Sequence, residues 1–412
     1  MIYKGENKTV LCKGDFHPAQ LYKGDKKIAG YTVEEFSAEG SVTLENCYND
    51  KLHNAQIIGN SIQDGTPTPD TPVEIQSVGE LVPEGEYAGK YKIPVVARGK
   101  NLLDVKNVYP DFANDENGIT ISNSDFNSKL TVRMPVEWKE STQYTFSANY
   151  EITNADSNGF FVRVQYTDDT TISLWNSMGG SGVTGDKNGT CTVITEKGKT
   201  VKAMFFSYST SGRKYNAKVT NMRLEEGITG TPYEPYVEPQ TFNIYLDEPL
   251  GRMTYANRIC ADYIDFEKSI VARYTFMEIY NGTEAWEMWS SSVGTFSNRI
   301  TTARTVRCSH YRTSGNIGSI DMSAVANYSA RFHIADSRFS TVDEFKAFLA
   351  EQASLGTPVT AVFLSYDAYT NKNPIEEPIT LPKLPTFKGT TIYEIDTQIP
   401  ATISGKYKKL EE

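Results

Sequence analysis

Two tryptophans of this chain stand where an indole ring could stack on a sugar. Trp175 follows Ile172 and Leu174 near the end of a predicted strand, on the opposite face, and Asn176 then opens a glycine-rich loop. Trp138 lies in PVEWKE, just before another predicted strand. An indole covers the apolar face of a sugar ring while amide and carboxylate groups hydrogen-bond to its hydroxyls. Trp138, Trp175 and Asn176 therefore form our candidate glycan-binding set.

Each tryptophan also has a structural interpretation. Tryptophans in small β domains lie in the core or at its edge more often than on ligand platforms, so both interpretations stay open for Trp138 and Trp175. We expect Trp286 and Trp289, in EAWEMW, to be structural.

Residues that would carry catalysis are sparse. The four histidines are scattered without metal-ligand spacing, and the sequence has no His-Glu-x-x-His, phosphate loop or Gly-x-Ser-x-Gly elbow. Glycoside cleavage needs only two carboxylates, but Asp168 and Asp169 lie in YTDDT, a turn that favours aspartate for its backbone hydrogen bonds. We assign no catalytic residue and expect that the protein is not an enzyme. A glycan-degrading enzyme is the minor alternative.

Calcium is the one metal for which the sequence offers suitable groups. FANDENG (112–118) and TDD (167–169) supply the carboxylate and carbonyl oxygens that a structural Ca²⁺ would use. We name no ligand residues and expect no other cofactor.

The elements that must position these residues are mostly strands. Residues 142–152 place Tyr144, Phe146 and other apolar side chains on one face, and Thr145 and Ser147 on the other, which predicts a half-buried strand. Similar segments follow, separated by Gly, Ser, Asn and Asp turns and without helices between them. This pattern is typical of a β-sandwich or jelly roll.

One helix interrupts the β pattern. Thr341 and Glu344 have capping-box spacing, and Phe345, Phe348 and Leu349 share a helical face. We expect a single amphipathic helix over about 342–354, packed on a C-terminal sheet, in a mainly β protein.

Composition narrows the class of protein. A chain of 412 residues is too long for one compact core, so we expect about two to three domains. The net charge of -10 disfavours nucleic acid as a partner. Five widely spaced cysteines indicate reduced thiols, and no apolar run has the length of a membrane span or the character of a secretory signal. We expect a soluble protein made in a cytoplasm, without membrane insertion.

Two features of the first eighty residues bear on the architecture. YKGENKTV (3–10), CKGDFHPA (12–19) and YKGDKKIAGY (22–31) each hold Lys-Gly and an acidic residue, which predicts short hairpins.

GNSIQDGTPTPDTPVEIQSVGE (59–80) holds Pro67, Pro69 and Pro72 between strand-like segments. A linker and a polyproline ligand are alternatives, but Asp64-Gly65 and the prolines favour a rigid corner.

Several stretches also resemble one protein family. In chain order they are FHPAQLYKGDKKIAGY (16–31), VTLENCYNDKLHNAQIIGNSIQDGTPTPDTP (42–72), GKNLLD (99–104), MRLEEGITGTPYEPY (222–236), ADYIDFEKSIVAR (261–273) and LPTFKGTTIYEIDTQIPA (384–401). Together and in this order they resemble tail-associated minor structural proteins from phages and prophages of Gram-positive bacteria. The resemblance implies a baseplate, tail-tip or tail-fibre protein with a central jelly roll similar to carbohydrate-binding modules. It supplies no residue-level binding site.

The resemblance and the flanking strand patterns predict four parts. Residues 1–50 form an N-terminal hairpin segment for attachment. Residues 100–237 form a jelly roll inserted into a discontinuous β-rich scaffold of residues 51–99 plus 238–400, since insertion at an exposed loop is well tolerated. Residues 401–412 form a C-terminal tail. This arrangement requires sheet contact between residues 73–98 and 240–400.

Two functions of different kinds follow from the resemblance. We favour a non-enzymatic virion tail protein that binds other tail proteins through its N-terminal segment and presents β domains to a host cell-wall glycan. The alternative is a structural connector that bridges the tail to a separate receptor-binding protein. Weak sugar sites and tail symmetry favour a homo-oligomer, and the family setting favours a trimer. Such a protein would be made and assembled in the cytoplasm of the host bacterium.

Overall fold

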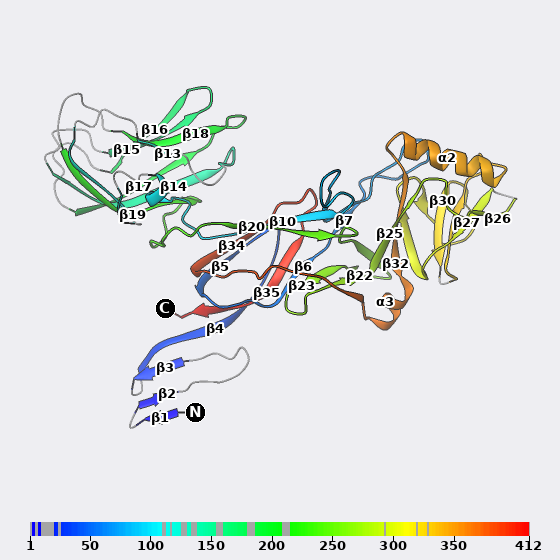
Figure 1. Ribbon diagram of the computed structural model, residues 1–412, viewed down its shortest axis with the longest axis horizontal. Helices are drawn as coiled ribbons and strands as arrows, with labels where there is room; N and C mark the ends of the chain where they lie inside the picture. The colour runs from blue at the N-terminus through cyan, green and yellow to red at the C-terminus, as the bar shows by residue number, and fades with distance from the viewer. Residues whose placement is uncertain are drawn as a thin grey trace.

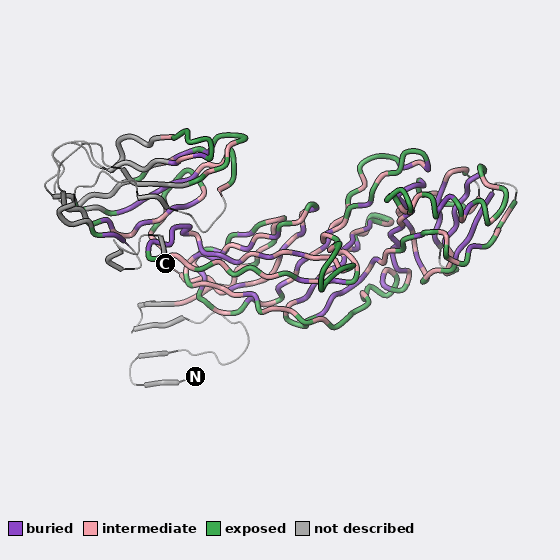
Figure 2. Tube along the Cα trace, turned by 45° about the horizontal axis from the view of Figure 1, so that its top comes forward, coloured by how far each residue is buried: buried purple, intermediate pink, exposed green. Residues whose placement is uncertain are grey.

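The structure is a computed structural model that describes residues 2–4, 7–9, 20–23, 26–108, 113–115, 118–124, 130–132, 138–153, 160–178, 186–207, 215–291, 294–318, 320–327 and 329–411. Its strands form three parts, which we name the central sheet, the sandwich and the distal unit (Figure 1). The predicted mainly β fold is confirmed. In all three parts, buried segments run along the strands and exposed segments concentrate at turns (Figure 2).

The central sheet has fourteen strands. Its main path runs β1-β2-β3-β4-β35-β5-β34-β10-β20, and β6, β9, β23, β24 and β33 pair beside this path. The strands are β1 (Ile2–Lys4), β2 (Asn7–Thr9), β3 (Gln20–Lys23), β4 (Lys26–Glu39), β5 (Ser41–Tyr48), β6 (His53–Ile58), β9 (Glu80–Leu81), β10 (Tyr91–Arg98), β20 (Gln240–Leu246), β23 (Tyr263–Asp265), β24 (Ile270–Arg273), β33 (Ile375–Pro378), β34 (Lys388–Ile395) and β35 (Thr402–Leu410).

Both ends of the chain contribute to the core of this sheet. Leu44, Ile57, Val95, Tyr393 and Ile403 are each 0% exposed and belong to one cluster of buried residues. Residues 402–410, which we expected as a C-terminal tail, form β35 and pair with β4 along its whole length. The chain end is therefore an internal strand of the central sheet.

The sandwich leaves and rejoins the central sheet on neighbouring strands. β10 and β20 pair antiparallel from Tyr91↔Leu246 to Ala97↔Gln240, and β10 also pairs with β34. The sheet contact between residues 73–98 and 240–400 that an insertion requires is therefore present.

Two sheets build the sandwich. One follows the order β11-β12-β19-β14-β17 and the other β13-β18-β15-β16. Their bounds are β11 (Ala113–Asp115), β12 (Gly118–Ser124), β13 (Leu130–Val132), β14 (Gln143–Thr153), β15 (Phe160–Tyr166), β16 (Thr171–Met178), β17 (Asp186–Ile194), β18 (Val201–Ser207) and β19 (Tyr215–Glu226), with one helical turn, α1 (Val105–Val108).

Strand β14 differs from the half-buried strand that we expected. Tyr144 and Phe146 are 1% exposed, as predicted, but Thr145 and Ser147 on the other face are also buried, at 0% and 4%. The reason is that the chain crosses this second face as it leaves the sandwich. Thr145 Oγ1 donates a hydrogen bond to the Gly227 carbonyl at 2.6 Å.

The distal unit has a core of its own, separate from that of the central sheet. A three-stranded sheet, β25-β32-β28, faces a five-stranded sheet, β26-β27-β31-β30-β29, and both pack with helix α2. The bounds are β25 (Thr275–Tyr280), β26 (Glu287–Ser290), β27 (Thr295–Arg299), β28 (Ala303–Cys308), β29 (Arg312–Thr313), β30 (Ser323–Asn327), β31 (Arg331–Ala335), α2 (Val342–Ser354), β32 (Val359–Ser365) and α3 (Tyr366–Asn371). Two small hairpins connect it to the central sheet: β7 (Ser61–Ile62) with β8 (Gln76–Ser77), and β21 (Arg252–Tyr255) with β22 (Arg258–Ala261).

The predicted helix is confirmed as α2. Thr341 Oγ1 accepts a hydrogen bond from the Glu344 amide at 3.2 Å, and the Glu344 carboxylate accepts one from the Thr341 amide at 3.1 Å. This is the capping box that the spacing predicted. Phe345, Phe348 and Leu349 are buried against the distal core. No helix in the described part of the chain is long and apolar enough to cross a membrane.

The proline-rich stretch forms a corner that packs on the distal unit. Pro67 and Pro69 are buried. Gln63 Nε2 donates to the Val73 carbonyl at 3.1 Å, which closes the corner, and the Val73 amide donates to the Ser309 carbonyl at 2.8 Å. The stretch therefore forms a corner held by hydrogen bonds, as the prolines and Asp64-Gly65 favour.

Candidate functional site

The predicted glycan-binding residues fall on two different sheets of the sandwich. Trp175 and Asn176 lie in β16, an edge strand of the four-stranded sheet, and their side chains are outside the described part of the structure. Trp138 precedes β14 of the five-stranded sheet, and its half-buried ring lies 4.4 Å from that of Tyr144. The fold does not place the two tryptophans on one sheet, and their role in binding stays a prediction.

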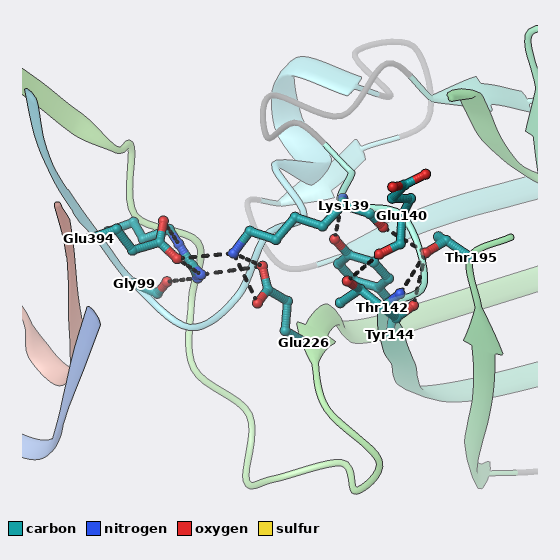
Figure 3. A network of polar contacts seen from close by, with 9 residues as sticks. Gly99, Lys139, Glu140, Thr142, Tyr144, Thr195, Glu226 and Glu394 are labelled. Carbon is teal, nitrogen blue, oxygen red and sulfur yellow. Dashed lines mark hydrogen bonds and ion pairs between the residues drawn. The ribbon is translucent and has the colours of Figure 1, made fainter. Parts of the chain in front are cut away.

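The residue after Trp138 belongs to the junction between the sandwich and the central sheet (Figure 3). Lys139 Nζ lies 3.2 Å from the Glu226 carboxylate and 3.3 Å from that of Glu394 in β34. Arg98, whose side chain is only 6% exposed, donates to Glu394 at 2.8 Å and pairs with Glu226 at 3.4 Å. This position favours the core-edge interpretation of Trp138.

Electrostatics at this junction favour the charged forms of Glu394 and Lys139. Burial raises the pKa of Glu394, but the hydrogen bond and charge of Arg98, with Lys139, outweigh it and hold that pKa below its usual range. Burial alone would lower the pKa of Lys139. The carboxylates of Glu394 and Glu226 outweigh this effect and raise that pKa above its usual value. The network therefore joins the sandwich to the central sheet through ion pairs.

The acidic turn proposed for calcium is engaged by neighbouring side chains. Asp168 accepts hydrogen bonds from the Thr170 hydroxyl at 2.6 Å and amide at 3.0 Å, and Lys199 lies 3.2 Å away. The Thr170 hydrogen bonds, with Lys199, lower the pKa of Asp168. Asp169 pairs with Lys202 at 2.8 Å. The other stretch, FANDENG, lies partly outside the described residues, and within those residues no three His, Cys, Asp or Glu side chains gather as a metal site.

One serine and one histidine are in contact, but in the interior. Ser309 Oγ lies 2.9 Å from His310 Nδ1 and accepts a hydrogen bond from the Thr360 amide at 2.8 Å. Ser309 is 5% and His310 1% exposed. The imidazole also lies within hydrogen-bond distance of Gln352 Oε1, at 3.3 Å from His310 Nε2, so the polar atoms of the pair are satisfied within the core and we interpret the pair as structural.

The two tryptophans of EAWEMW have opposite environments. Trp286 is 6% exposed and packs against Tyr280 and Phe345 in the distal core, so its predicted structural role is confirmed. Trp289 is 53% exposed, and the prediction of a structural role does not describe it.

Strand geometry explains the exposure of Trp289, and the sequence carried the signal. Met288 of β26 packs against the distal core. Successive side chains of a strand point to opposite faces, so Glu287 and Trp289 on either side of Met288 point outwards. An alternation of Glu, Met and Trp therefore identifies the exposed indole once β26 is recognised as a strand.

Trp289 lies in a group of polar side chains on the outer face of the five-stranded sheet. The Arg331 guanidinium lies 5.3 Å from the centre of the Trp289 ring. Arg331 Nη1 donates to Glu287 Oε2 at 2.9 Å and to Ser297 Oγ at 2.8 Å. His333 contacts the indole from the sheet, with ring centres 5.0 Å apart and planes at 71°. We name Glu287, Trp289, Ser297, Arg331 and His333 the Trp289 platform.

The platform is close to neutral in charge. Arg331 is compensated by Glu287, and burial, with the nearby Arg331 charge, lowers the pKa of His333 to about 4. At neutral pH His333 is therefore an uncharged imidazole, which has one hydrogen-bond donor and one acceptor.

The platform combines an indole with polar side chains, which is the combination that the sequence predicts at Trp175. An exposed indole lies beside a carboxylate, a guanidinium and a hydroxyl, all fixed by contacts with strands β26, β27 and β31. An indole with adjacent polar groups fits the apolar face and the hydroxyls of a sugar.

Comparisons with known proteins give no family. No family model matches the chain, and neither does any curated protein. Among solved structures, the particle of the Gt strain of infectious bursal disease virus aligns with 92% of this chain and 83% of its own at 8% identity and a TM-score of 0.14. The VP2 subviral particle of infectious bursal disease virus aligns with 91% of this chain and 80% of its own at 6% identity and a TM-score of 0.14. Similarity at this level supports no argument about fold or function.

Proposed function

We propose that this chain is a non-enzymatic component of a bacteriophage tail, in the tail tip, baseplate or tail fibre, that presents β domains to a glycan on the host surface. The observation that carries the binding part of this proposal is Trp289, 53% exposed on a sheet and beside the paired side chains of Arg331 and Glu287. The tail setting rests on the sequence resemblance.

The layout of the chain is consistent with attachment at one end and binding at another. The N-terminal strands β1 to β3 and the strand β26 that carries Trp289 lie far apart in Figure 1. In our proposal the N-terminal segment binds other tail proteins, so that the distal unit points away from the tail. The protein would be made in the host cytoplasm and would act in the virion, without membrane insertion or nucleic-acid binding.

Weak sugar sites need more than one copy to hold a virion. Joining several sites on one particle raises the overall affinity by avidity, without any new contact. We therefore propose a homo-oligomer, with a trimer favoured by the tail setting. With a net charge of -10, a neutral saccharide is a more suitable ligand than a polyanionic wall polymer.

The test is binding of the full chain to purified cell walls from Gram-positive bacteria. Trp289→Ala should weaken binding at least about tenfold, because the stacking surface is lost. Tyr48→Ala is the matched control, since Tyr48 is an aromatic residue of β5 that is 51% exposed and lies outside the distal unit. It should bind as the wild type does. Trp175→Ala, in the same assay, tests the sandwich prediction.

The connector function has one observation in its favour. The sandwich is held to the central sheet by the buried Arg98 and its carboxylate partners, as a rigid spacer would be. Failure of the full chain to bind any wall, together with stable incorporation into tails, would favour the connector. Release of reducing sugar from walls would instead favour the enzyme alternative.

A further inference from the structure

We propose that His333 of the Trp289 platform and the neighbouring Thr295 form a polar floor beside the indole that receives the hydroxyl groups of a neutral sugar. This inference rests on the proposed function and specifies the ligand class and the contacts beneath the indole. The ligand is an uncharged saccharide that stacks on Trp289 and inserts a hydroxyl-bearing edge towards the sheet.

The floor consists of buried polar atoms without partners. His333 is 1% exposed, and neither of its ring nitrogens has a hydrogen-bond partner among the described residues. Thr295 is 0% exposed, and its hydroxyl is also unpaired within that part of the chain. Buried polar side chains are paired in the large majority of cases, so two unpaired ones on one sheet require an explanation.

Strand register places the two side chains on the same face. Ser297 of β27 lies directly opposite His333 of β31, and Thr295 is two residues from Ser297 along β27. Residues two apart in a strand share a face and are about 7 Å apart. Phe296, between them, points into the distal core. The floor is therefore a row of Thr295, Ser297 and His333 across two neighbouring strands.

Arg331 covers the Ser297 end of this row. It crosses from the Trp289 ring to Ser297, and its ion pair is with Glu287, whose side chain is 57% exposed. An ion pair to an exposed carboxylate contributes little to stability, so displacing the Arg331 side chain is inexpensive. In our proposal this displacement frees Ser297 Oγ for the ligand, next to His333 on the neighbouring strand.

The chemistry of the floor selects an uncharged ligand. A sugar hydroxyl both donates and accepts, as do the threonine and serine hydroxyls and a neutral imidazole. The only cation of the platform is already paired with Glu287. A carboxylate or phosphate on the ligand would have to displace Glu287 or lie beside it, and like charges in contact repel. A buried water at the floor is the competing explanation, since ordered waters satisfy many buried polar groups.

The experiment uses the full chain and the cell walls bound by the wild type. His333→Phe and Thr295→Val remove the unpaired polar atoms while keeping similar volumes. Each should lower wall affinity at least about tenfold, as loss of a hydrogen-bonded contact does. Thr145→Val is the control: it is an equally buried threonine in the sandwich, and its hydroxyl has a partner in Gly227. It should leave wall affinity unchanged.

Competition identifies the ligand class. Methyl glucoside, methyl galactoside and N-acetylglucosamine are the neutral probes, and glucuronic acid is the anionic counterpart of glucose. We expect a neutral probe to displace the protein from walls. The same probe should shift the indole N–H signal of Trp289 in an NMR spectrum, where this signal is assigned by its absence in Trp289→Phe. Stronger competition by glucuronic acid than by every neutral probe would overturn the ligand class.

The outcomes separate this inference from the proposed function. If His333→Phe and Thr295→Val bind walls as the wild type does while Trp289→Ala does not, the floor holds only water and the inference fails, but the platform stands. If the wild type binds no wall, the proposed function fails and the inference fails with it.

Discussion

At the residue scale, the Trp289 platform combines features that a purely structural surface would not keep together. Trp289 exposes an indole to solvent, while His333 and Thr295 bury polar atoms that have no partner in the described structure. Each unpaired buried polar group costs about 1–3 kcal/mol. Residues that lower stability in this way are expected where binding, and not folding, determines their type.

His333→Phe should therefore stabilise the protein while it weakens binding. Replacing the unpaired imidazole by an apolar ring of similar size removes the desolvation cost, so we expect the free energy of unfolding at neutral pH to rise by about 1–3 kcal/mol. The pH dependence should change too. Denaturant unfolding of both proteins, from pH about 7 to about 4.5, provides the measurement.

The sign of the pH effect follows from the lowered pKa of His333. The unfolded chain protonates this histidine below its ordinary pKa of 6.5, whereas the folded protein does so only near about 4. Between these values the unfolded state binds more protons, so acidification lowers the free energy of unfolding. The wild type should lose about 1–3 kcal/mol more than His333→Phe across this window. Equal slopes for the two proteins would show that His333 is not buried as a neutral group.

At the scale of elements, ion pairs at the root of the sandwich set its position on the central sheet. Arg98 ends β10, Glu394 lies in β34 and Glu226 ends β19, so the pairs join the two parts at three strands. The buried member is Arg98, with a side chain that is 6% exposed, and the exposed member is Lys139, at 52%.

Replacing these two cations should have unequal effects. Arg98→Ala leaves the partly buried carboxylates of Glu226 and Glu394 without their main partner and should lower the free energy of unfolding by about 2–4 kcal/mol. Lys139→Ala removes an exposed partner of the same carboxylates and should cost less than about 1 kcal/mol. Differential scanning calorimetry of both variants measures the difference. Equal costs would mean that the junction is solvated and does not fix the sandwich.

Elements with a strong local pattern could be predicted from the sequence. The helix at 342–354 was found because the capping box and the apolar face are local signals, and they correspond to α2. Strand β14 was found from its alternation, but not the burial of Thr145, because the residues that cover it lie some eighty positions later. The same limit explains β35: its pairing with β4 joins the two ends of the chain, which no local pattern records.

The Trp289 platform shows a different limit of sequence reasoning. The sequence predicts an indole beside polar groups at Trp175, which stays a prediction, and it did not identify the same chemistry at Trp289. Glu287 and Trp289 lie close in sequence, but Arg331 and Ser297 come from other strands. Register between β26, β27 and β31 determines their contacts, and register depends on the whole sheet.

At the scale of the whole molecule, three β parts are joined by short, fixed connections. Residues 63–73 brace the distal unit through the Val73 amide and the Ser309 carbonyl, and β10 with β20 carries the sandwich. The central sheet also receives the N-terminal strands. The connections therefore hold the three parts of the chain at set positions.

The response of wall binding to salt depends on the charge of the whole molecule, and it distinguishes a neutral ligand from a polyanion. The chain carries a net charge of -10, so it is repelled by anionic wall polymers, and salt screens that repulsion. If the ligand is a neutral sugar on Trp289, affinity should stay constant or rise slightly between about 0.05 and 0.5 M NaCl. The measurement is the amount of protein that cell walls retain at both salt concentrations. Trp289→Ala gives the background. A fall of more than about tenfold would instead indicate that cations of the protein contact a polyanion, because screening lowers affinity only where attractive charge pairs contribute to binding.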